Sequence, residues 1–312
     1  MSFSRLACIF CLFAITLSGA STAGHSQGVF RLHFKVAGDS MIVVPIHINS
    51  SGPLDFILDT GTSRTVIDRK LAEKFQLVKV GERIMSGVEG SISSPVFETD
   101  SISMAGASVR GLRISSQHDC PGQTRGILGE DFLNHFDLLI DYGAHVIELE
   151  PIVQRQGTSE AGVLSSGTSG DRLPVELEGQ FGGHTTANRL VLPVVVPELG
   201  AKPLHLLLDS GSNTFLVFNQ VAKAKTSLQQ QTYHAESFLG GGGTLSAGVL
   251  VLPAVSLGSQ EVFHVTVIMP TQKIEVDVDG VVPASLFHSI FICHSGRFVI
   301  LKPIRQRVSV TP

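Results

Sequence analysis

The pattern of hydrophobic and polar positions along the chain indicates short β-strands. Apolar stretches rich in Val, Ile and Leu recur through residues 29–304, and turns containing Gly, Pro, Ser or Asn separate them. Helical periodicity is limited to short segments such as 68–75, 130–136 and 219–225. The chain contains 32 Gly, which fits many turns between short strands. The pattern therefore predicts an all-β fold with a few short helices.

Two segments of the chain repeat one order of features. In residues 45–75 and 193–225, a strand, a turn and an apolar strand lead into Asp-Thr-Gly or Asp-Ser-Gly, and another strand and a short helix follow. A glycine-rich stretch, a pair of strands and a closing hairpin come next in each half. The corresponding intervals are similar: 150 residues from Asp59 to Asp209, 154 from Gly126 to Gly280, and 152 from Pro151 to Pro303. The chain is therefore predicted to hold two copies of one β-unit.

These copies set the expected domain organisation. We predict homologous lobes at residues 29–152 and 186–304, and a linker rich in Gly, Ser and Thr at residues 153–185. Residues 1–23 are typical of a secretory signal, because Arg5 precedes an apolar run of 12 residues at 6–17 and small residues follow as far as Ala23. The run is shorter than the ~20 residues of a membrane-spanning helix. We therefore expect an exported protein, secreted or periplasmic, that leaves the membrane after signal cleavage.

Charge and cysteine content narrow the function classes. The formal net charge is −4 and no basic run is present, so nucleic-acid binding is not expected. Cys120 and Cys293 are the cysteines beyond the signal, and in an exported protein they can form a disulfide or remain as buried thiols. Their spacing from His118, His288 and His294 fits no common zinc pattern, so neither a metal nor another cofactor is expected.

The two Asp-x-Gly turns suit a pair of catalytic carboxyl groups. Asp59 follows the apolar strand 54–58 and Asp209 follows the apolar strand 204–208, so each lies where a buried strand enters a loop. Two carboxyl groups within roughly 3 Å of each other hold one proton between them. The ionised group can take a proton from a water molecule, and the protonated group can donate to a carbonyl oxygen. One lobe alone would carry half of such a site, which we expect in a cleft between the lobes.

The residues after each aspartate suit the task of orienting this pair. The residue directly after each aspartate carries a short hydroxyl that can bond to the opposite loop. The next residue is glycine, which lets two loops approach closely. The hydroxyl residue three positions after each aspartate is placed to donate to its carboxylate. These positions are Thr60 and Ser210, Gly61 and Gly211, and Thr62 and Ser212.

These motifs resemble the pepsin and retropepsin clan of aspartic proteases. The matching residues are DTGTS at 59–63, DSGSN at 209–213 and the hydrophobic-hydrophobic-Gly element at 127–129. The compact units look like retropepsin modules, and their tandem arrangement resembles a single-chain pepsin and the bacterial-type aspartyl proteases. The resemblance implies two homologous pepsin-like lobes, catalytic roles for Asp59 and Asp209, and hydrolysis of peptide bonds in polypeptide substrates.

The resemblance also implies a glycine-rich hairpin, the flap, that closes over the substrate. The flap candidates are Gly87 and Gly90 in segment 86–91, and Gly241 and Gly242 in segment 239–244. Four consecutive glycines in the second segment fit a surface loop without function as well. The second half carries Val-Val-Pro at 281–283 where the first carries Ile-Leu-Gly, and because Pro283 lacks an amide hydrogen the strand there is expected to differ.

Other interpretations stay open. A pepsin-like scaffold can serve a secreted binding or inhibitory protein, since a fold does not guarantee activity. Each module could also pair with a module of another chain, although a monomer is the simpler expectation. Asp209-Ser210-Gly211 lacks the flanking glycines and the histidine motif of a serine protease. The acidic residues Asp131, Asp137 and Asp141 are expected to face solvent around the short helix at 130–136.

Overall fold

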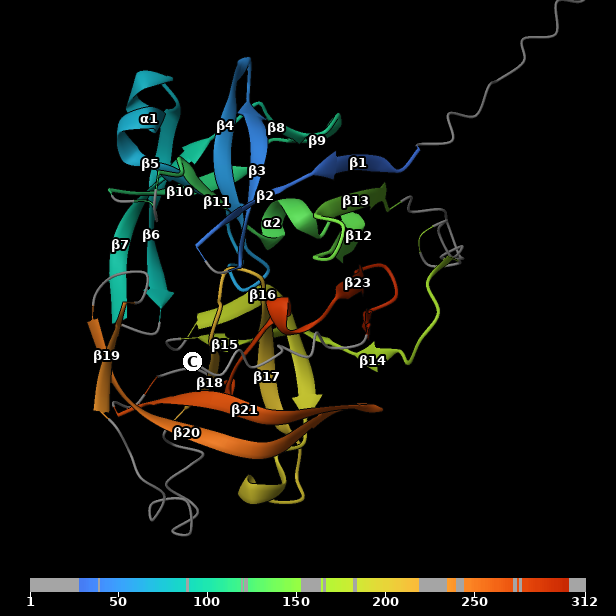
Figure 1. Ribbon diagram of the computed structural model, residues 1–312. Coiled ribbons are helices and arrows are strands. Elements are labelled where there is room, and N and C mark those ends of the chain that lie inside the picture. The colour runs from blue at the N-terminus through green and yellow to red at the C-terminus, as the bar shows by residue number, and fades with distance from the viewer. Residues whose placement is uncertain are drawn as a thin grey trace, which may run out of the picture.

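The computed structural model describes residues 28–38, 40–87, 90–118, 120, 123–152, 164, 167–181, 184–218, 235–239, 244–271, 274 and 277–302. Strands dominate this part of the chain, and the predicted all-β fold with few short helices is confirmed (Figure 1). The predicted signal and the predicted helix at 219–225 lie outside the described residues. Within those residues, no helix is long and apolar enough to cross a bilayer.

One sheet of ten strands forms what we call the first lobe. Its strands are β2 (Lys35–Ala37), β3 (Met41–Ile48), β4 (Ser51–Leu58), β5 (Val66–Asp68), β6 (Val78–Gly87), β7 (Gly90–Glu98), β8 (Ser101–Met104), β9 (Ala107–Arg110), β10 (Arg113–Gln117) and β11 (Gly126–Leu128). Helix α1 (Arg69–Lys74) begins where the Asp68 carboxylate accepts from Leu71 N at 3.0 Å. Helix α2 (Glu130–Leu133) follows β11.

A second sheet of eight strands forms the second lobe. Its strands are β15 (Glu176–Phe181), β16 (His184–Val194), β17 (Leu204–Asp209), β18 (Phe215–Val217), β19 (Ala235–Leu239), β20 (Thr244–Leu257), β21 (Gln260–Pro270) and β22 (Gly280–Pro283). Two 3₁₀ turns, η1 (Pro197–Leu199) and η3 (Ala284–Leu286), accompany them.

The centres of the two lobes share one strand arrangement. In the first lobe β4 runs parallel to β11, β11 antiparallel to β5, and β5 parallel to β10. In the second lobe β17, β22, β18 and β21 are paired in the same order with the same directions. The apolar ends of the central strands are buried, as in Phe56-Ile57-Leu58 of β4, which reads as a continuous apolar run because both faces are covered.

A third sheet of six strands joins the lobes, and we call it the shared sheet. Its order is β1 (Phe30–His33), β13 (Val146–Pro151), β12 (Phe136–Asp141), β23 (Ser289–Cys293), β24 (Phe298–Leu301) and β14 (Leu173–Pro174). The closing hairpins predicted for the two halves are therefore neighbours, since β12 of one pairs with β23 of the other. Part of the segment expected to be a linker, 153–185, instead forms β14 and β15.

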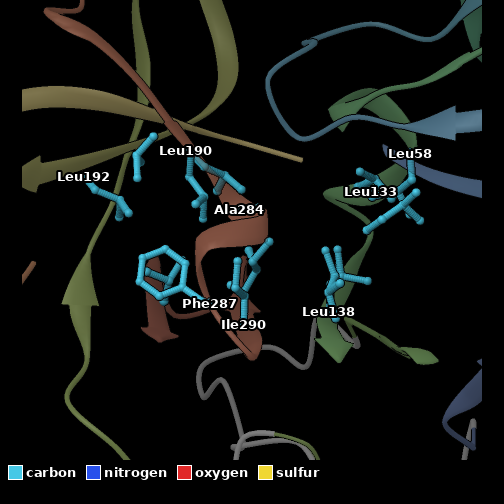
Figure 2. Close-up of a cluster of buried hydrophobic side chains, with 14 of the residues drawn as sticks. Leu58, Leu133, Leu138, Leu190, Leu192, Ala284, Phe287 and Ile290 are labelled. Carbon is cyan, nitrogen blue, oxygen red and sulfur yellow. The ribbon is translucent and has the colours of Figure 1, made fainter. Parts of the chain in front are cut away.

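One apolar core runs through all three sheets. Figure 2 shows side chains from the first lobe, the shared sheet and the second lobe in one continuous cluster: Leu58, Leu133, Leu138, Ile290, Ala284, Phe287, Leu190 and Leu192. Removing this surface from water favours association of the lobes without fixing their register, because the hydrophobic effect is not directional.

Candidate active site

Asp59 and Asp209 lie at the ends of corresponding strands. Asp59 directly follows β4, and its amide donates to the Leu128 carbonyl of β11 at 3.0 Å. Asp209 is the last residue of β17 and is paired in register with Pro283 of β22. Each central strand thus ends in an aspartate loop beside a parallel neighbour, and both loops lie where the two lobes meet.

Four hydrogen bonds between the lobes tie the aspartate loops together. Thr60 Oγ1 donates to Leu208 O at 2.9 Å and accepts from Ser210 N at 3.0 Å. Reciprocally, Ser210 Oγ donates to Leu58 O at 2.8 Å and accepts from Thr60 N at 3.0 Å. Both hydroxyl residues are 1% exposed, so breaking these bonds would leave buried polar groups unpaired. Each lobe therefore fixes the loop of the other.

The glycines after these residues bring the carboxyl groups close to the opposite loop. A Cβ atom added to Gly61 would lie 2.5 Å from Asp209 Cγ. In the same way, a Cβ atom added to Gly211 would lie 2.6 Å from Asp59 Cγ. Any side chain at either position would occupy the space of the opposing carboxyl group. Glycine is thus required by the close approach of the two loops.

The two carboxyl groups have different hydrogen-bond partners. Asp59 Oδ1 accepts from Gly61 N at 2.8 Å and from Thr62 N at 3.1 Å, and Asp59 Oδ2 accepts from Thr62 Oγ1 at 2.6 Å. Asp209 Oδ1 accepts from Gly211 N at 2.7 Å.

The expected donation from the Ser212 hydroxyl to Asp209 is not made. Ser212 Oγ donates to Thr214 O at 3.0 Å and accepts from Thr214 N at 3.2 Å, so the local turn takes up the hydroxyl. Thr62 thus orients its aspartate through a hydroxyl, whereas Ser212 contributes its backbone amide.

The surroundings of Asp209 favour its protonated form. Burial raises the pKa of Asp209 well above its usual range, and the charge of Asp59 and a hydrogen bond with that residue raise it further. The amides of Gly211 and Ser212 oppose the shift. A carboxyl group with a raised pKa beside one that accepts three hydrogen bonds suits acid–base chemistry at a shared site.

The flap candidates lie in or next to paired strands. Gly87 ends β6, Gly90 begins β7, and the two are paired in register, so the first candidate segment is a β-hairpin. Gly241 and Gly242 lie outside the described residues, between the antiparallel strands β19 and β20. The strand arrangement flanking both segments is therefore similar in the two lobes.

Buried acidic residues beside the Asp59 loop were missed by the sequence argument. Asp131 is 5% exposed, and its Oδ1 accepts from Thr65 N at 2.8 Å and from Thr65 Oγ1 at 2.7 Å. Glu130 and His294 are also buried. The expectation that Asp131 and Asp137 face solvent is wrong, because both are 5% exposed and bonded to backbone or hydroxyl groups. The signal available in the sequence was the pair of acids directly after the Ile-Leu-Gly element.

The space around residue 129 in the first lobe is too small for a side chain, whereas the corresponding position in the second lobe holds Pro283. A Cβ atom added to Gly129 would lie 2.6 Å from the carbonyl carbon of Arg64, and the Gly129 amide donates to Thr65 Oγ1 at 3.2 Å. The corresponding residue in the second lobe, Pro283, has a side chain and lacks an amide hydrogen. Strand β22 nevertheless stays paired with β17 as far as Pro283. The lobes do differ here, because β22 extends through Pro283 and a 3₁₀ turn follows it, whereas β11 ends at Leu128 and an α-helix follows Gly129.

Cys120 and Cys293 are not joined to each other by a disulfide in the structure. Cys293 is buried in the shared sheet, with Sγ 3.6 Å from Asp137 Oδ2 and 3.3 Å from Ser295 Oγ. Cys120 lies beyond β10 of the first lobe, 3.7 Å from Gln117 Nε2. Across the described residues, no three His, Cys, Asp or Glu side chains are grouped to hold a metal ion.

Comparisons with known proteins find a similarity to aspartyl proteases over part of the chain. A family model described as "Aspartyl protease" matches residues 44–132, which contain Asp59, its loop and the hydrophobic-hydrophobic-Gly element. A retropepsin-like aspartic protease from Rickettsia conorii is among the similar solved structures, with 17% identity, a TM-score of 0.31, and coverage of 39% of this chain and 91% of that one. No curated protein matches. Residues 44–132 of this chain are therefore similar to the aspartyl protease family.

Proposed function

We propose that the chain is an aspartic endopeptidase in which Asp59 and Asp209 form one catalytic pair. The observation that carries the proposal is the reciprocal bonding of Thr60 and Ser210, which holds two carboxyl groups from opposite lobes against each other. The proposed substrate is a polypeptide in extended form. The similarity of residues 44–132 to an aspartyl protease family supports the reaction class, and the geometry supports the choice of Asp59 and Asp209 as its residues.

The unequal hydrogen bonding suggests a role for each carboxyl group in the free enzyme. Asp59 accepts three hydrogen bonds, which stabilise its ionised form, so it acts as the base. Asp209 holds the shared proton and acts as the acid. Because such pairs titrate as a unit, the assignment describes the dominant microstate of the pair.

The proposed reaction has two steps. The Asp59 carboxylate takes a proton from a water molecule while the water oxygen bonds to the peptide carbonyl carbon, and Asp209 gives its proton to the carbonyl oxygen. The resulting diol loses its C–N bond when the proton on Asp59 passes to the nitrogen. A diol hydroxyl then returns a proton to Asp209. The products are a carboxylic acid and an amine, and both aspartates regain their first state.

Both half-sites belong to one chain, which supports a monomer as the active form. The contacts between the aspartate loops join residues 58–60 to residues 208–210 within the same molecule. We further propose that the enzyme acts after export, on the basis of the signal-like residues 1–23.

Digestion of a peptide library between pH 3 and 8, with and without pepstatin, tests the proposal. Asp59→Asn and Asp209→Asn should each reduce kcat/KM by at least about 10³-fold while the far-UV circular dichroism stays that of the wild type. Measurement of the solution mass under assay conditions should give a monomer. Cleavage retained in either variant would refute the mechanism. A folded wild-type protein that binds peptides and cleaves none would favour the binding scaffold instead.

A further inference from the structure

A buried acid–base pair joins the first lobe to the shared sheet beside the Asp59 loop. Glu130 is the first residue of α2 in the first lobe, and His294 directly follows β23 in the shared sheet. His294 Nε2 lies 2.9 Å from Glu130 Oε2, and the side chains are 3% and 0% exposed. Within the described residues, Glu130 Oε1 has no hydrogen-bond partner, so His294 is the polar group on which this carboxyl depends.

The geometry fixes how many protons the pair carries. His294 Nδ1 lies 2.6 Å from the Phe136 carbonyl, which can only accept, so Nδ1 carries a hydrogen. The contact between Nε2 and Oε2 needs one more proton, located on either atom. The pair therefore holds either an imidazolium and a carboxylate or a neutral imidazole and a carboxylic acid. Its total charge is zero in both forms.

The pair is connected to the catalytic carboxylate through backbone. The Glu130 amide donates to Thr62 O at 2.8 Å, and Thr62 supplies two of the three donors to Asp59. A movement of Glu130 would therefore move the residue that orients Asp59. The position corresponding to Glu130 in the second lobe is Ala284, directly after Pro283, and it has no ionisable side chain.

We propose that Glu130 and His294 are positioning residues that lock the Asp59 loop against the second half of the chain. The Thr60 and Ser210 bonds fix the loops at their tips, and this pair adds a charged contact behind the loop. The catalytic consequence rests on the proposed function, whereas the contact between the first lobe and the shared sheet does not.

The pair should hold its proton over a wide pH range. Glu130 is near Asp59, Asp131 and His294, while His294 is near Glu130, Asp137 and His135. Burial raises the pKa of Glu130, and the negative charges of Asp59 and Asp131 act in the same direction, although His294 opposes them. Burial alone would lower the pKa of His294, but Glu130, Phe136 O and Asp137 raise it above its usual value.

Both shifts have the same consequence for stability. A group whose pKa is raised on folding contributes stability that is fully present below its unfolded pKa and is lost as pH rises through the folded pKa. The Glu130–His294 contact therefore persists at acidic pH and weakens at alkaline pH. This range includes the acidic conditions in which a pair of aspartates shares a proton.

Two single variants separate a charge-paired contact from simple packing. In Glu130→Gln, protonation of the His294 imidazole creates a buried cation without a counter-charge. The variant should therefore lose more stability, relative to the wild type, at pH 5 than at pH 8. In His294→Gln, ionisation of the Glu130 carboxyl group creates a buried anion without a counter-charge. This variant should therefore lose more stability, relative to the wild type, at pH 8 than at pH 5. At the worse pH, each melting temperature should fall by on the order of 5–10 °C. The matched control His288→Gln, whose side chain is 53% exposed, should show no such dependence.

Each outcome of these measurements supports or overturns one part of the proposal. Opposite pH slopes for the two variants, together with a kcat/KM about tenfold below that of His288→Gln, support the positioning role. Equal penalties at both pH values would overturn the proposal, because packing alone does not depend on protonation. Wild-type kcat/KM in both variants would overturn the catalytic half. If the wild-type protein cleaves no peptide, the proposed function fails, and the melting temperatures still test the contact between Glu130 and His294.

Discussion

Thr60→Ala removes a hydroxyl that makes two of the four bonds between the aspartate loops. Thr60 Oγ1 donates to Leu208 O and accepts from Ser210 N, at 2.9 and 3.0 Å. The substitution leaves a buried carbonyl and a buried amide without these partners. Since an unpaired buried polar group costs about 1–3 kcal/mol, we expect the free energy of unfolding to fall by about 2–4 kcal/mol.

Thr60→Ser is the matched control for this variant. It keeps the hydroxyl that reaches the opposite loop and removes one methyl group, which costs about 1 kcal/mol. Urea unfolding followed by circular dichroism measures both losses on one scale. Peptide cleavage by the same samples, under conditions in which each is folded, measures whether Asp59 and Asp209 are still aligned. A misplacement of about 1 Å can reduce a rate about 10²-fold, so kcat/KM of Thr60→Ala should fall by that order while Thr60→Ser stays near the wild type.

The comparison can refute the reasoning in two ways. Equal unfolding free energies for Thr60→Ala and Thr60→Ser would show that the hydroxyl contributes nothing to the junction between the lobes. Wild-type cleavage by a folded Thr60→Ala protein would show that the cross-lobe bonds do not align the carboxyl groups. The first result would overturn the stabilising role of these bonds, and the second would overturn their role in aligning Asp59 with Asp209.

Three further predictions follow from the same region. Gly61→Ala places a Cβ atom 2.5 Å from Asp209 Cγ, so peptide cleavage should fall by at least about 10²-fold in a steady-state assay. In Gly129→Ala the added Cβ atom meets the Arg64 backbone at 2.6 Å, so the free energy of unfolding measured in urea should fall by about 1–3 kcal/mol. Pro283→Ala, at the corresponding position, should lower it by under about 1 kcal/mol. Equal losses in the two variants would contradict the difference in available space between the two positions. Because the pKa of Asp209 is raised on folding, the wild type loses stability as pH rises through that pKa, so Asp209→Asn should gain in urea midpoint relative to the wild type between pH 4 and pH 8.

Features determined by neighbouring residues could be predicted from the sequence. An apolar strand followed by Asp, a hydroxyl residue and Gly indicates a buried strand that enters a tight loop, and both β4 and β17 end in this way. Short apolar runs with turns predicted strands, and the helical periodicity of residues 68–75 predicted the helix that the structure places at Arg69–Lys74. Gly61 and Gly211 also predicted a close approach of the two loops, since a residue without a side chain at the same place in both halves suggests that both places lack room for one.

Features determined by distant partners could not be predicted in this way. The pairing of β12 with β23 joins strands about 150 residues apart, and the edge of a hairpin does not identify its partner. The burial of Asp131 and Glu130 depends on Thr65 and His294, which lie far away along the chain. The Ser212 hydroxyl bonds to Thr214 rather than to Asp209, a choice between two acceptors that the sequence leaves equal.

The differences between the two lobes have a chemical use. With identical surroundings, two carboxyl groups would share their proton equally, and neither would be set as base or acid. Here Thr62 adds a hydroxyl donor to Asp59, whereas Ser212 directs its hydroxyl away from Asp209. Glu130 and His294 support the Asp59 loop, whereas Ala284 holds the corresponding position near Asp209. These differences all strengthen the polar support of Asp59, so the same strand arrangement can place one ionised and one protonated carboxyl group at a single site.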